Sequence, residues 1–214
     1  MKKATARKVF GRGRPSIERA SAIDSAILSA AKDLFLRDGF DGVTMEAVAI
    51  ATPLSKTTLY SRFASKEILL AAVIHDRIQQ WSKNASQNDI GLPDDIGERL
   101  KGHARTMAQA IREPEVLGFT RLSFLLTERF PEMARLMYKE GYLLHVAFIR
   151  GEIEAAAARD GRPVRDAEAV AKHFVNSIAG WNIQENPRGD ITLEEAVACA
   201  ERSAELILAA RDHW

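Results

Sequence analysis

Apolar residues recur three and four positions apart along almost the whole of this 214-residue chain. That spacing places them on one face of an α-helix, and no run shows the strict alternation that a β-strand needs. Prolines and glycines fall at the boundaries of these segments, at Pro114, Pro131, 161–163 and 187–189. The sequence therefore predicts an all-α protein. Helices are expected at 16–38, 44–52, 55–63, 65–83, 95–112, 115–130, 131–158, 166–183 and 192–211, with a polar turn at 84–93.

Charge is distributed unevenly along the chain. Up to Lys66 there are twelve Lys and Arg against six Asp and Glu, a balance of +6, whereas the remainder carries −5. Residues 1–14 contain six basic residues and no acid, and such a tail attracts polyanions. We expect a disordered basic arm at 1–15, a small helical domain at 16–64 and a larger helical domain at 65–214.

Several protein classes are excluded by composition. No segment approaches the roughly 18 uncharged apolar residues of a membrane helix, and the Gly-Arg-Gly-Arg that follows Phe10 interrupts any secretory signal. Cys199 is the only cysteine, so an internal disulfide and a cysteine-rich metal site are both ruled out. We expect a reduced, cytoplasmic protein with no cofactor, no metal and no membrane partner.

The run LSKTTLYSRFASK at 54–66 indicates DNA binding. Leu59 and Phe63 are four apart and share the face by which a short helix is held, while polar side chains occupy its other faces. A preceding short helix, capped by Thr44 and ended by Thr52 and Pro53, completes a helix-turn-helix arrangement. The alternative is that such a run is only a solvated helix start.

Each polar residue of this run has an expected role. Lys56 can donate to a guanine edge, and Thr57 and Thr58 can bond to a base or a phosphate. Tyr60, Ser61 and Arg62 would reach the DNA backbone on the flanks. Lys66, at the start of the next helix, would pair with a phosphate.

The stretch from 44 to 74 resembles the DNA-binding domain of the TetR/AcrR family of bacterial transcriptional regulators. The resemblance lies in Thr-Leu-Tyr-x-x-Phe at 58–63, Ser-Lys-Glu at 65–67, Asp-Gly-Phe at 38–40 and Val-Thr-Met at 43–45. It implies a homodimer whose paired recognition helices enter successive major grooves of a palindromic operator. The DNA contacts implied are Thr44, Ser55, Lys56, Thr57, Thr58, Tyr60, Ser61, Arg62 and Lys66.

Two positions depart from the family pattern. Pro53 stands where the turn usually has glycine, and because proline cannot adopt a positive φ, the turn geometry is expected to differ. Thr57 replaces a common glycine near the start of the recognition helix. An operator sequence therefore cannot be transferred from a relative.

The arm carries Gly-Arg-Gly-Arg-Pro at 11–15, which resembles an AT-hook core. In that motif, arginines on an extended backbone enter the narrow minor groove of A·T-rich DNA, so Arg12 and Arg14 are candidate contacts. The alternative is a tail that adds only non-specific affinity.

The rear domain shows no local catalytic or metal signature, and no enzymatic activity is expected. The family resemblance implies that this domain dimerises through its last two helices, the alternative being burial within one chain. The interface candidates are Val170, Phe174, Ile178, Trp181, Val197, Ala200, Ala204 and Ile207.

The resemblance also implies a pocket for an unidentified small effector among the middle helices. Such aromatic and apolar stripes are ordinarily core. The candidates are His103, Met107, Phe119, Phe124, Tyr138, Tyr142, His145, Phe148 and Trp81, of which the polar members would orient the effector.

These features favour a transcriptional repressor that binds double-stranded DNA as a homodimer, is released by the effector and is nucleoid-associated when bound. The alternatives are an architectural protein for A·T-rich DNA, without an effector, and an enzyme.

Overall fold

The computed structural model describes residues 17–88 and 91–214, and within those ranges the chain is helical with no strand. This confirms the predicted all-α class. The elements are α1 (Ile17–Gly42), α2 (Met45–Ala51), α3 (Lys56–Arg62), α4 (Lys66–Asn88), α5 (Ile96–Ile111), α6 (Pro114–Arg129), α7 (Pro131–Met137), the π-helix η1 (Tyr138–Leu143), α8 (Leu144–Asp160), α9 (Ala167–Glu185), η2 (Asn186–Arg188), α10 (Leu193–Ala209) and η3 (Arg211–His213).

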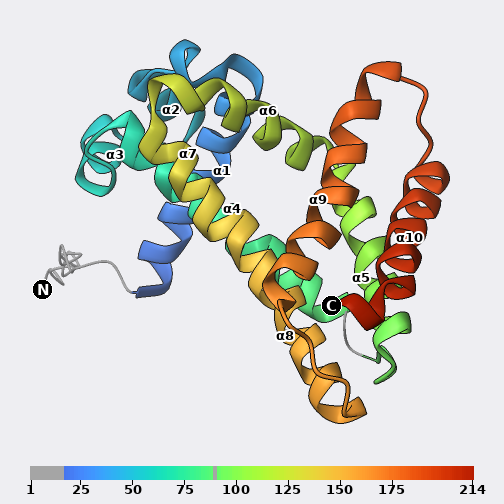
Figure 1. Cartoon of the computed structure of the whole chain (residues 1–214). Coiled ribbons are helices and arrows are strands. Elements are labelled where there is room, and N and C mark those ends of the chain that lie inside the picture. The colour runs from blue at the N-terminus through green and yellow to red at the C-terminus, as the bar shows by residue number, and fades with distance from the viewer. Residues whose placement is uncertain (1–16, 89–90) are drawn as a thin grey trace, which may run out of the picture.

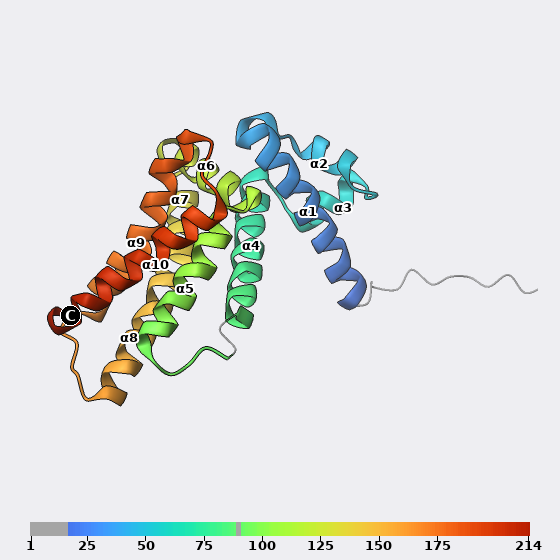
Figure 2. The same cartoon turned by 90° about the vertical axis from the view of Figure 1, so that its right-hand side faces the viewer.

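Helix α4 stands between the two parts of the molecule. Figure 2 shows α1–α3 on one side of it and α5, α8, α9 and α10 on the other. α4 contacts α1 on the first side, and α7 and η1 on the second. A movement of α4 would therefore change packing contacts in both parts of the molecule.

Capping side chains start most of the helices where the sequence predicts them. The hydroxyl oxygens of Thr44, Ser55 and Ser65 accept hydrogen bonds from the backbone N–H three residues ahead. Each cap satisfies a donor that the first helical turn would otherwise leave open. Ser16, the expected first residue of the 16–38 helix, lies outside the described residues.

The end of α1 depends on Gly39, whose φ of +69° interrupts regular helix. Phe40 then folds back, with its ring 6.1 Å from that of Phe35 and 4.5 Å from that of Phe130. The sequence predicts this break after Asp38, because glycine adopts the left-handed region without steric cost.

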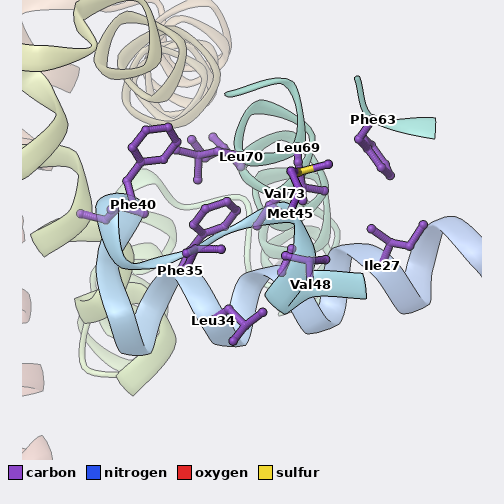
Figure 3. Packing of buried hydrophobic residues seen from close by; sticks show 14 of the residues in the cluster. Ile27, Leu34, Phe35, Phe40, Met45, Val48, Phe63, Leu69, Leu70 and Val73 are labelled. Carbon is purple, nitrogen blue, oxygen red and sulfur yellow. The ribbon is translucent and has the colours of Figure 1, made fainter. Parts of the chain in front are cut away.

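Two hydrophobic clusters hold the fold. The first joins α1–α4 with residues of α6, and Figure 3 shows Phe35, Phe40, Leu69 and Leu70 packed within it. The second joins α5, α8, α9 and α10 around the fully buried Phe174.

Two helical segments differ from the sequence prediction. α4 continues to Asn88 rather than ending near Lys83, so part of the expected 84–93 turn is helical. The helix expected at 131–158 changes to π geometry at Tyr138–Leu143 before it continues as α8. Gly141 in that segment lies against α4, since a Cβ there would meet the Ile78 side chain at 3.8 Å.

None of the described helices is long and apolar enough to cross a membrane.

Candidate nucleic-acid interface

The turn between α2 and α3 is built without a left-handed residue. Thr52 is extended, with φ −118° and ψ 152°, as expected for a residue before proline. Its buried hydroxyl can donate to the carbonyl oxygen of Val48 or of Ala49, which lie 3.3 and 3.2 Å from Thr52 Oγ1. In the described ranges only glycines have positive φ. Thr52 and Pro53 thus make an extended turn that needs no glycine.

Apolar side chains fix α3 against the rest of the domain. Leu59 is 0% exposed, Phe63 is buried, and both belong to the first hydrophobic cluster with Met45 and Val48 of α2. The recognition helix is therefore held rigidly by one face, as the spacing of Leu59 and Phe63 predicts.

The opposite side of α3 presents its polar residues to solvent. Ser55 caps the helix, and its Oγ lies 2.9 Å from the Thr58 hydroxyl. Ser61 Oγ donates to the Thr58 carbonyl. Lys56, Thr57 and Tyr60 are exposed. A short helix with a free polar face and an open N-terminus suits a major groove.

Arg62 and Lys66 have partners inside the domain. The Arg62 guanidinium donates to both carboxylate oxygens of Asp24 on α1, at 3.0 and 2.9 Å. Lys66 donates to the Phe40 carbonyl at 2.7 Å and lies 4.2 Å from the centre of the Phe40 ring. Their contacts with DNA stay a prediction, and each side chain would have to leave or share its partner to make them.

Glu46, a surface residue in the first turn of α2, is not among the DNA contacts predicted from the sequence. Its carboxylate lies 3.6 Å from Lys56 Nζ and accepts from the Tyr60 hydroxyl at 3.5 Å. Bonding to its own backbone N–H, followed by the charge of Lys56, lowers the pKa of Glu46. The only sequence signal for this location is that Glu46 lies two residues after the Thr44 cap, in the first turn of the helix that precedes α3.

Arg12 and Arg14 of the arm lie outside the described residues. In the described part of the chain, no three His, Cys, Asp or Glu side chains gather as a metal site would require.

Three of the effector candidates come together in the rear domain. The Phe148 ring on α8 lies 5.1 Å from the ring of His103 on α5 and 6.5 Å from that of His145. His103 is buried, and its Nε2 is 3.9 Å from the Glu152 carboxylate, which also accepts from Arg99. Burial, with a smaller effect of nearby His103, lowers the pKa of His145 to about 4.

The other effector candidates have different surroundings. Phe119 packs on Trp81, 5.4 Å between ring centres, in the first hydrophobic cluster, and Met107 is buried in the second. Tyr138 and Tyr142 stack on each other at 5.3 Å. Phe124 is 63% exposed in the single chain, and its place in an effector pocket stays a prediction.

Half of the predicted dimer residues face the core of their own chain. Phe174, Ile178, Ala200 and Ala204 are at most 1% exposed in the single chain, and their place in an interface stays a prediction. The helical spacing identified the apolar stripe that packs within the chain. Val170, Trp181, Val197 and Ile207 are partly exposed and stay candidates.

A groove of about 400 Å³ lies on the outer face of α9 and α10. It is lined by Val170, His173, Ser177, Ser203, Leu206, Ile207, Ala210 and Trp214.

Known proteins share both parts of this architecture. The family model described as bacterial regulatory proteins, tetR family, matches residues 27–73, and that of the AefR-like transcriptional repressor C-terminal domain matches 98–210. The chain is 46% identical over 155 residues to the uncharacterised HTH-type regulator YdeS of Bacillus subtilis, covering 66% of this chain and 71% of YdeS. An uncharacterised HTH-type regulator of Mycobacterium tuberculosis is 30% identical over 142 residues, covering 64% of this chain and 68% of the relative.

Solved structures agree in fold. A TetR-family regulator structure from Mesorhizobium loti, described there as putative, superposes with a TM-score of 0.81 at 24% identity, covering 90% of this chain and 98% of that one. The flavonoid-responsive regulator FrrA has a TM-score of 0.72 at 28% identity, covering 89% and 97%. With helix-turn-helix and C-terminal domain models matching in order along one chain, this protein belongs to the TetR family of bacterial transcriptional regulators.

Proposed function

We propose that this protein is a repressor that binds a palindromic operator as a homodimer and leaves it when a small effector binds. The observation that carries the proposal is α3, which is anchored by Leu59 and Phe63 and presents Lys56, Thr57 and Tyr60 to solvent. Such a helix reads base edges in one major groove, and a symmetric pair reads two grooves about 34 Å apart.

The groove on α9 and α10 supports dimerisation. Leu206 is 59% exposed at its edge, beside the partly exposed Val170 and Ile207. An exposed apolar groove favours burial against a complementary surface. Two copies related by a twofold axis would cover it with the same two helices, forming a four-helix interface.

The His103, His145 and Phe148 group supports an effector site. Two imidazoles beside an aromatic ring can hold a polar group of a largely apolar molecule, because the rings bury apolar surface while the ring nitrogens form hydrogen bonds. FrrA is flavonoid-responsive by its title, so planar aromatic compounds are a reasoned first class of probe for this chain.

Helix α4 supplies a route from effector to DNA. His75 on α4 contacts the Glu140 carboxylate on η1 at 2.7 Å, while Lys66 at the start of α4 bonds to Phe40 beside the DNA-binding helices. An effector releases DNA if it binds better to a conformation whose α3 spacing does not fit the operator.

Footprinting of the full-length protein on the DNA around its own gene tests the proposal. We expect one protected site with twofold symmetry, with protection lost when the effector is added. Protection of scattered A·T-rich tracts without symmetry would instead support an architectural protein. Operator affinity that no bound ligand changes would contradict release by an effector.

A further inference from the structure

Glu46 brings a negative charge into the surface that faces DNA. Between Asp41 and Glu67 it is the only acidic residue, in a segment that also contains Lys56, Arg62 and Lys66. Its side chain is half exposed and lies beside the exposed N-terminal turn of α3. This is the turn that a recognition helix directs at base edges.

The local fold does not need this carboxylate. Thr44 already caps α2, since its hydroxyl oxygen accepts from the Ala47 N–H at 3.1 Å. An acid in the first turn favours the helix dipole, but an exposed position makes that effect small. The pKa of Glu46 is lowered, so the group is ionised at neutral pH.

Lys56 and Tyr60 orient the carboxylate from α3. Both reach the same oxygen, Oε1, at 3.6 and 3.5 Å. A carboxylate has about four acceptor positions on its two oxygens, more than its contacts with Lys56, Tyr60 and its own backbone N–H use. A carboxylate at a base edge can accept from an exocyclic amine, as cytosine N4 offers in the major groove, whereas a phosphate repels it.

We propose that Glu46 is a specificity-determining residue, which accepts a hydrogen bond from an exocyclic base amine of the operator and disfavours DNA that lacks that amine in register. The inference rests on the proposed function, since it requires that α3 enters the major groove. Lys56 then acts partly as a positioning residue for Glu46 rather than as a free cation for guanine or phosphate.

The test compares the full-length wild type with Glu46→Ala, which removes charge and acceptor, and Glu46→Gln, which removes the charge but keeps an acceptor. Glu113→Gln, at the exposed start of α6, is the matched control for loss of one negative charge. Each protein selects from random-sequence duplexes. Its affinity for the wild-type-selected sequence and for a scrambled duplex is then measured by fluorescence anisotropy over a salt series.

We expect Glu46→Ala to bind scrambled DNA more tightly than wild type, because a repulsive charge is gone. Its preference for selected over scrambled DNA should fall about fivefold or more, and one amine-bearing position in each half-site should become degenerate. Glu46→Gln should also bind scrambled DNA more tightly, while retaining preference for an amine-bearing base at that position. Glu113→Gln should match wild type in both affinities.

A Glu46→Ala protein that keeps the wild-type ratio and every base preference overturns the inference, provided that its circular dichroism is that of the wild type. The same holds if Glu113→Gln reproduces the changes, since net charge alone would then explain them. A wild-type protein that selects no sequence overturns the proposed function as well, so the two failures are distinguishable.

Discussion

At the scale of single residues, α3 separates buried side chains that hold the fold from exposed side chains that we propose to contact DNA. Leu59 is fully buried against α2, whereas Thr57, two positions earlier, is exposed. Removing the Leu59 side chain would leave a cavity in the first hydrophobic cluster. Removing the exposed Thr57 hydroxyl would create no cavity, because water fills its place.

We therefore expect Leu59→Ala to lower the free energy of unfolding by about 2–5 kcal/mol. Thr57→Ala should change it by no more than about 0.5 kcal/mol while weakening operator binding. Urea unfolding followed by circular dichroism measures the first quantity and anisotropy titration the second. Equal stability losses in the two variants would contradict the assignment of the two faces.

His145 makes stability depend on pH. Burial lowers the pKa of His145 from its ordinary value of 6.5 to about 4 in the folded chain, so the unfolded chain takes up the proton at a higher pH than the folded chain. The stabilisation is complete above pH 6.5 and is lost as pH falls toward 4, by roughly 3 kcal/mol. His145→Gln should flatten the dependence of the unfolding free energy on pH over this range, as measured by urea unfolding at a series of pH values. An unchanged slope in His145→Gln would show that another group is responsible.

At the scale of elements, Gly151 inside α8 and Gly161 directly after it occupy positions with opposite conformational requirements. Gly151 is exposed within the helix, and a Cβ there would meet nothing within 4 Å. Gly161 ends the helix with a φ of +63°, and its N–H donates to the Ala157 carbonyl. The first position tolerates any side chain, and the second favours glycine.

Gly151→Ala should raise the free energy of unfolding by about 0.5–1 kcal/mol, because alanine loses less conformational entropy in a helix. Gly161→Ala should lower it by about 1 kcal/mol, because the left-handed region is strained for alanine. Both changes in the free energy of unfolding can be calculated from the denaturant midpoints, provided that the variants have the same m-value as the wild type. The same sign for both variants would contradict the described helix end.

At the scale of the whole molecule, the proposed function links the outer groove of α9 and α10 to DNA binding by α3 through the association of two chains. We expect Leu206→Glu to place a charge in the groove, shift the protein toward monomer and weaken operator binding at least tenfold, since one half-site offers half of the contacts. Leu125→Glu, on the exposed face of α6, is the matched control. Analytical ultracentrifugation reports the mass, and a monomeric Leu125→Glu with a dimeric Leu206→Glu would place the interface elsewhere.

The helix-turn-helix could be predicted closely because its signals are local. Caps at Thr44 and Ser55, the break at Pro53 and the four-residue spacing of Leu59 and Phe63 each act over a few positions, and the family resemblance rests on the same residues. The rear domain was less predictable. A buried stripe and an interface stripe have the same helical period, so the sequence could not show that Phe174 and Ile178 are buried within their own chain.

The sequence by itself determined the all-α class, the ends of α2 and α3 and the buried face of α3, because periodicity, caps and prolines act within one or two turns. Only the tertiary structure decided which face of α9 and α10 is buried, that His103, His145 and Phe148 meet, and that Glu46 lies beside Lys56 and Tyr60. These relations join residues far apart in sequence or on separate helices. They depend on how the helices pack, and the spacing of side chains along one helix does not show which other helix packs against it.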